Sequence, residues 1–98
     1  MPTFAVTYYY ADNSEQRRNQ HRPDHVAFLH GLHDEGILYM SGAMATEPPR
    51  ALLVLEADDQ SALEARLDQD PFFVNGLVGR RDVSVWSVFF DPREQHQR

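Results

Sequence analysis

The histidines are the residues in this sequence whose chemistry and spacing suggest a functional site. Of the five, His25 stands out because helical spacing places it with Phe28, Leu29 and Leu32 on one apolar face. An imidazole in such a position can carry protons near neutral pH if an acceptor such as a carboxylate fixes its tautomer. His25 is therefore a candidate general base or acid whose partner must come from elsewhere in the chain. A structural hydrogen bond within the core is the alternative.

The remaining histidines suggest a metal site only weakly. His21 and His25 are spaced i,i+4 and His30 and His33 are spaced i,i+3, and either spacing can put two ligands on one side of a helix. His21 precedes Pro23, however, and is expected outside the helix. His30 projects about 140° away from His25 around a helical wheel. Because no third ligand has a convincing spacing, we predict no metal.

Four further residues are candidate substrate contacts. Ser41 and Gly42 end a predicted strand, where a hydroxyl or a backbone N–H could bind a substrate oxygen. A serine nucleophile is not favoured because no G-x-S-x-G turn surrounds Ser41. Arg22, close to His25, could hold an anionic group or simply be exposed. Phe72 could line an aromatic pocket, although aromatic residues at strand spacing more often form a core or a dimer interface. The other aromatic residues of this kind are Tyr8, Tyr10, Phe73 and Trp86.

Composition narrows the functional class. The 98 residues carry a formal charge of −6 and no lysine, which argues against a general nucleic-acid binder. The absence of cysteine excludes disulfides, thiolate nucleophiles and zinc-thiolate sites. No stretch approaches the ~18 apolar residues of a membrane span, and no basic-then-apolar leader opens the chain. We expect a cytoplasmic protein with no membrane or nucleic-acid partner.

The apolar patterns predict six elements that must position these residues. Strands are predicted at residues 3–10, 37–43, 50–57 and 81–90. Pro23 suits the first turn of a helix and Gly36 its end, so one helix is expected at 23–35, after a loop at 15–21. Asp58 or Asp59 is expected to cap a second helix that reaches Leu67. Residues 70–76 are expected to form a sharp junction, in which Asp70 before a proline is biased away from helical geometry and Gly76 closes a short apolar turn.

The order β-α-β-β-α-β predicts an α+β, ferredoxin-like fold with an antiparallel sheet and both helices on one face. Residues 1–91 are expected to form a single domain and 92–98 a polar tail. Because several strands offer apolar residues to both faces, the open face is expected to bury against a second copy. We therefore predict a homodimer or a larger oligomer.

Two stretches together resemble the YciI-like (YCII-related domain) proteins. Residues 22–29 and 34–42 resemble the family segment RPxHLxxL…EGxLLxxGP, and residues 70–78 resemble DPFxxAGL. This resemblance implies two ferredoxin-like halves forming a dimeric α/β barrel, related in fold to muconolactone isomerases. It also implies an active site in which His25 pairs with Asp70. One characterised activity in the family is the dehydrochlorination of a chlorinated hydroxyhydroquinone, without metal or organic cofactor.

Two functional hypotheses follow from these observations. The first is a small cofactor-independent enzyme of the lyase or isomerase type, acting on a small cyclic or aromatic oxygenated metabolite. His25 would be its acid or base, Asp70 would orient that histidine, and Arg22, Ser41, Gly42 and Phe72 would contact the substrate. The second is a dimeric small-molecule-binding or accessory protein that uses the same pocket without turnover.

Overall fold

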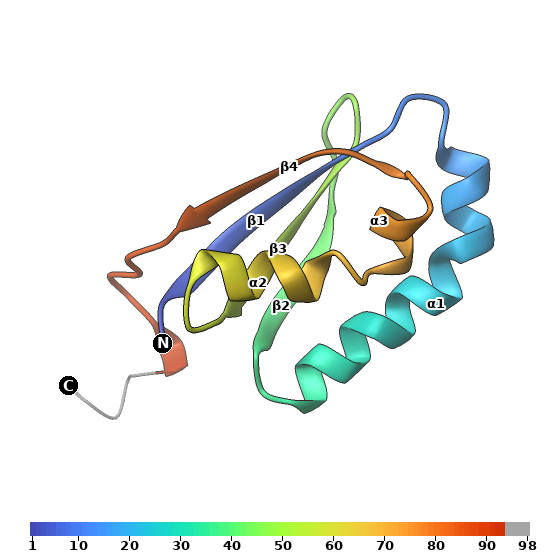
Figure 1. The fold of residues 1–98 in the computed structure, drawn as a ribbon. Helices are drawn as coiled ribbons and strands as arrows, with labels where there is room; N and C mark the ends of the chain where they lie inside the picture. The colour runs from blue at the N-terminus through green and yellow to red at the C-terminus, as the bar shows by residue number, and fades with distance from the viewer. Residues whose placement is uncertain (94–98) are drawn as a thin grey trace.

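The computed structural model describes residues 1–93 and contains one four-stranded antiparallel sheet in the order β2-β3-β1-β4 (Figure 1). The strands are β1 (Thr3–Tyr10), β2 (Leu38–Met44), β3 (Arg50–Glu56) and β4 (Val78–Val85). The helices are α1 (Glu15–Asp34), α2 (Gln60–Leu67) and the short α3 (Pro71–Val74). The element order confirms the predicted α+β, ferredoxin-like fold, to which α3 adds one helical turn.

The core lies between one face of the sheet and the helices. Alternate residues of β1 point inward. The register places inward-pointing residues of β3 opposite them, for example Leu53 opposite Val6. Apolar residues of the helices cover these side chains, which removes them from water. The buried cluster consists of Phe4, Val6, Tyr8, Leu32, Leu38, Ala51, Leu53, Leu55, Leu63 and Leu67.

Helix α1 begins at Glu15, eight residues earlier than predicted, so the expected loop at 15–21 was wrong. That segment lacks an apolar period, but its Glu, Gln and Arg residues are strong helix formers that need no burial. Pro23 lies inside the helix, where it removes one backbone hydrogen bond, rather than at its start. His25 is consequently in the middle of α1 and not in its first turn, so it lies away from the positive end of the helix dipole.

Between α1 and β4 the predictions are partly confirmed. Asp59 is the residue that caps α2, since its carboxylate accepts the N–H of Ala62 at 2.8 Å. Asp70 is extended, as predicted for a residue before proline, and Pro71–Val74 then form a helical turn that was not predicted. Gly76 then ends that turn with a φ of +71°, a conformation that disfavours residues with a Cβ.

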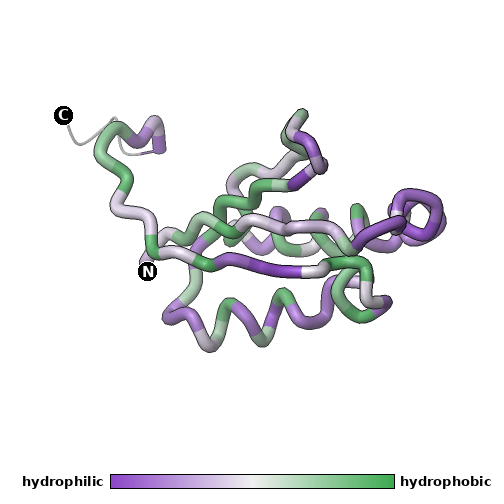
Figure 2. The backbone as a smooth tube through the Cα atoms, turned by 90° about the horizontal axis from the view of Figure 1, so that it is seen from above, coloured by the Kyte–Doolittle hydropathy of each residue, from purple (hydrophilic) through white to green (hydrophobic). Residues whose placement is uncertain are grey.

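Strand β4 runs from Val78 to Val85 and not over residues 81–90 as predicted. Its pairing with β1 ends where Val85 lies opposite Phe4, followed by a hydrogen bond from Trp86 N to Thr3 O. The following segment leaves the sheet on the side away from the helices (Figure 2). It carries Phe89 and Phe90, which are 83% and 80% exposed.

Among residues 1–93, no helix is long and apolar enough to cross a membrane.

Candidate active site at the His25–Asp70 pair

Asp70 is a fully buried carboxylate at the start of α3 and accepts three hydrogen bonds. Its Oδ1 accepts the Phe72 N–H at 2.9 Å and is 2.8 Å from Nδ1 of His25. Its Oδ2 accepts the Tyr8 hydroxyl at 2.9 Å. A buried charge is tolerated when its oxygens are satisfied in this way. Asp70 therefore joins β1, α1 and α3 at one point.

His25 is held in one orientation by two contacts. An ionised carboxylate only accepts hydrogen bonds, so Nδ1 of His25 carries the proton that it donates to Asp70. The imidazole also stacks on the Phe72 ring, with the ring centroids 3.9 Å apart and the planes 1° from parallel. The His25 side chain is only 12% exposed. When the imidazole is neutral, a proton on Nδ1 leaves Nε2 as the ring nitrogen that can accept a proton from a ligand.

Tyr8 is a member of the site that the sequence analysis did not identify as a partner of Asp70. Burial, followed by the nearby Asp70 charge and its hydrogen bond, raises the pKa of Tyr8 far above its usual range. Its hydroxyl therefore stays protonated and donates to Asp70 at every physiological pH. A buried tyrosine hydroxyl needs a partner, so the inward position of Tyr8 on its strand was the signal available in the sequence.

Arg81 supports Tyr8 from the neighbouring strand. The two residues are register partners on β4 and β1, and the guanidinium charge partly offsets the increase in the Tyr8 pKa. Nη2 of Arg81 donates to Glu64 at 3.1 Å and to Asp68 at 2.8 Å, which anchors β4 to α2. This arginine was not predicted to belong to the site, because nothing local in Arg80-Arg81 distinguishes it from an exposed doublet.

A cavity of about 140 Å³ lies beside His25. Three predicted substrate contacts line it, namely Arg22 from α1 and Ser41 and Gly42 from β2. Ser41 lies in the middle of β2 and not at its end, opposite Leu53 of β3. Phe72 does not line the cavity, because it is fully buried and stacks on the His25 ring. The other lining residues are Tyr8, Tyr10, Val26, Leu29, Ala43, Ala51 and Leu53.

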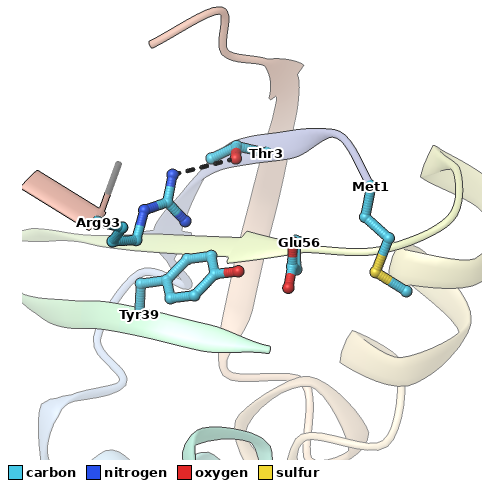
Figure 3. Close-up of a pocket in the computed structure, with 5 residues that line it drawn as sticks. All are labelled: Met1, Thr3, Tyr39, Glu56 and Arg93. Atoms are coloured by element: carbon cyan, nitrogen blue, oxygen red, sulfur yellow. Dashed lines mark hydrogen bonds between the residues drawn. The ribbon is translucent and has the colours of Figure 1, made fainter. Parts of the chain in front are cut away.

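A second hollow, of about 300 Å³, lies between Thr3, Tyr39, Glu56, Arg93 and Met1 (Figure 3). The Arg93 guanidinium there pairs with Asp91 and lies over the Tyr39 ring at 3.9 Å. Burial, followed by the proximity of Glu56, raises the pKa of Tyr39, so its hydroxyl is neutral at physiological pH. We assign no catalytic role to this hollow.

Within residues 1–93, no group of three His, Cys, Asp or Glu side chains is arranged to hold a metal ion.

A comparison with known protein families gives a match that includes the motifs around His25 and Asp70. The family model described as "YCII-related domain" matches residues 3–87, which is most of the chain. The chain belongs to the YCII-related domain family. The predicted family membership is thereby confirmed, and both segments that carried the resemblance lie inside the match. No curated protein matches the sequence of this YCII domain.

A solved structure similar to this YCII domain is 5-chloro-2-hydroxyhydroquinone dehydrochlorinase (TftG) from Burkholderia phenoliruptrix AC1100, in complex with 2,5-dihydroxybenzoquinone. The TM-score is 0.75 and the sequence identity is 20%, over 87% of this chain and 93% of that one. At this identity the likeness establishes a shared fold. Function has to be argued from the site.

Proposed function

We propose that this YCII domain is a small enzyme of the lyase or isomerase type that uses His25 as general base and acid. Asp70 would orient the imidazole and stabilise its protonated form. The observation that supports this most directly is the Asp70–His25 hydrogen bond at 2.8 Å, beside a largely apolar cavity that Arg22 and Ser41 also line. The same bond fixes Nε2 as the nitrogen available to a ligand.

The proposed step is a proton transfer followed by loss of a leaving group or return of the proton. Nε2 takes a proton from a phenolic hydroxyl or an acidic C–H, and the released electron pair moves into the substrate. After loss of a C–H proton, a leaving group such as chloride on the neighbouring carbon departs with its bonding pair. After loss of a phenolic proton, His25 returns that proton to the chlorine-bearing ring carbon, and chloride departs with its bonding pair as Nε2 takes the proton of a second hydroxyl, which leaves a quinone. Ser41 and Gly42 would bind a substrate oxygen. The step needs no metal and no organic cofactor.

The proposed substrate is a small oxygenated ring. A cavity of about 140 Å³ is close to the ~150 Å³ that accommodates benzene in an engineered protein cavity. The structurally similar dehydrochlorinase acts, by its name, on a chlorinated hydroxyhydroquinone, and its structure holds a dihydroxybenzoquinone. We infer that compounds of this class are the substrates to test first. A cytoplasmic location remains our expectation.

The decisive experiment measures chloride release from 5-chloro-2-hydroxyhydroquinone by the purified protein. We expect catalysed release in the wild type and a decrease of about 10²–10⁴-fold in His25→Gln, since a positioned general base contributes that much. His30→Gln is the matched control, because His30 is an exposed histidine on the same helix. Asp70→Asn should also lower the rate, because an amide cannot stabilise the imidazolium as a carboxylate does.

The accessory-protein hypothesis predicts a different outcome. In that case 2,5-dihydroxybenzoquinone binds to the wild type, as measured by calorimetry, while no chlorinated or lactone substrate turns over. A wild type that binds the ligand and shows the same slow chloride release as His25→Gln would refute the enzyme proposal. If His25→Gln instead affects only stability, the pair is a structural hydrogen bond.

We further propose a homodimer formed through the sheet face that the helices leave open. Val54 is buried on that face, whereas Met40, its register partner on β2, is 60% exposed. Trp86 and Phe90 lie beside them around a small cavity. A second copy would bury these side chains. Sedimentation should show a dimer for the wild type and for the control Val74→Glu on α3, and a monomer for Met40→Glu. A wild-type monomer would refute the proposal.

A further inference from the structure

Some arginines of the described residues have no carboxylate partner, and two of these, Arg18 and Arg22, lie near the His25 cavity. All nine basic residues of the chain are arginines, because it has no lysine. Within residues 1–93, four arginines form ion pairs with carboxylates: Arg66, Arg80, Arg81 and Arg93. Arg18 and Arg22, one turn apart on α1, have no carboxylate within 4.0 Å among the described residues. Two guanidinium charges in an acidic protein are thus left free to meet a ligand.

Both guanidinium groups are placed by neutral partners. Nε of Arg18 donates to the Ser14 hydroxyl at 3.0 Å, and its Cζ lies 4.1 Å from the centroid of the Tyr10 ring. Nη2 of Arg22 donates to Asn19 at 3.1 Å, and its Cζ lies 5.7 Å from the Phe72 ring that supports His25. Each group has further N–H donors, because a guanidinium carries five. The two positions are therefore set before a ligand arrives.

Tyr10 connects these arginines to the proposed active site. It lines the His25 cavity together with Arg22, and it also lines a neighbouring hollow of about 510 Å³ together with Arg18. Burial raises the pKa of Tyr10, while the charges of Arg18 and Arg22 act in the opposite direction. Arg18 lies over the Tyr10 ring, and Arg22 lines the same cavity as Tyr10. A ring beside His25 could extend a substituent past Tyr10 toward both of them.

We propose that Arg18 and Arg22 bind an ionised oxygen substituent of the ring substrate, such as a carboxylate or a phenolate. This inference rests on the proposed function for the location of the ring and adds the charge of the substrate. Asp70 and a net charge of −6 would otherwise repel an anion. Arg22 in the cavity and Arg18 in the neighbouring hollow supply the compensating charge and determine specificity, whereas His25 transfers the proton.

The test compares binding of two probes that differ in charge but hardly in shape, 2,5-dihydroxybenzoate and 2,5-dihydroxybenzamide, by calorimetry. We expect the wild type to bind the carboxylate at least about tenfold more tightly, as charge-assisted hydrogen bonds imply. Arg18→Gln and Arg22→Gln should each reduce that preference severalfold, and the double variant should abolish it. Affinity for the neutral amide should fall much less than affinity for the carboxylate in both single variants.

Arg17→Gln is the matched control. Arg17 is the neighbour of Arg18 on α1 and also lacks a carboxylate partner among the described residues, but it donates to the backbone oxygen of Asn75. It lines neither cavity. A preference that is absent in the wild type, that survives in the double variant, or that falls equally in Arg17→Gln would overturn the inference. Chloride release that depends on His25 would leave the proposed function standing in each of these cases.

Discussion

Replacing Tyr8 by phenylalanine tests whether the Asp70 network is organised as the structure shows. The change keeps the ring that fills the core and removes only the hydroxyl that donates to Oδ2 of Asp70 at 2.9 Å. Both residues are fully buried, so water cannot replace the lost donor. Hydrogen bonds to charged groups contribute about 1.5–3 kcal/mol. We expect Tyr8→Phe to lower the free energy of unfolding at pH 7 by that amount.

The same variant has a predictable pH dependence. The pKa of Tyr8 in the folded state is raised above the ordinary tyrosine value of about 10, first by burial and then by Asp70. Above pH 10 the unfolded chain therefore releases the Tyr8 proton while the folded chain keeps it. The wild type then loses about 1.4 kcal/mol of stability per pH unit from this group, and the phenylalanine variant loses none. The advantage of the wild type should disappear between about pH 11 and 12.

Urea denaturation followed by circular dichroism at pH 7, 9, 10.5 and 11.5 measures this difference. Tyr10→Phe is a suitable control for the value at pH 7, because Tyr10 lies on the same strand and its hydroxyl makes no side-chain hydrogen bond to another described residue. We expect a cost below about 0.5 kcal/mol for that control, since no hydrogen bond is lost. A difference between wild type and Tyr8→Phe that stays constant from pH 7 to 11.5 would refute the reasoning.

Two further predictions concern stability. Asp59→Ala should cost about 0.5–2 kcal/mol in urea denaturation because it removes the N-cap of α2, while Asp58→Ala should cost nearly nothing; equal costs would contradict the assigned cap. Gly76→Ala should destabilise the folded protein by about 1 kcal/mol, because φ at this residue is +71°. Gly31→Ala should stabilise it by about 0.5–1 kcal/mol, because Gly31 lies within α1 with open space around it. Thermal unfolding of this glycine pair should show shifts of opposite sign.

The sequence alone determined most of the secondary structure and the family. Strand β1 was predicted with its observed bounds, and the structure shows that Phe4, Val6 and Tyr8 form its core face. The motif around His25 and the one around Asp70 together indicated the YCII-related domain, and the family model confirmed it. Local patterns suffice for these features because periodicity, caps and breakers act over a few residues.

Element ends that depend on distant residues were predicted less well. Glu15–His21 had no apolar stripe, so an exposed, polar first part of α1 looked like a loop. The apolar residues 86–90 looked like a strand, but β1 offers no partner beyond Thr3. In both cases the tertiary arrangement, rather than local preference, decided where the element begins or ends.

At the site, too, the sequence indicated some residues and only the tertiary structure showed their surroundings. The sequence indicated His25 and, through the family resemblance, Asp70 as residues of interest, but it could not show what surrounds them. Only the fold brings Tyr8, from a strand 62 residues away in sequence, against Asp70, and stacks Phe72 on the imidazole. Only the fold leaves Arg18 and Arg22 free of carboxylates beside Tyr10. Hydrogen bonds and charges depend on distance in space, and the folded chain sets that distance.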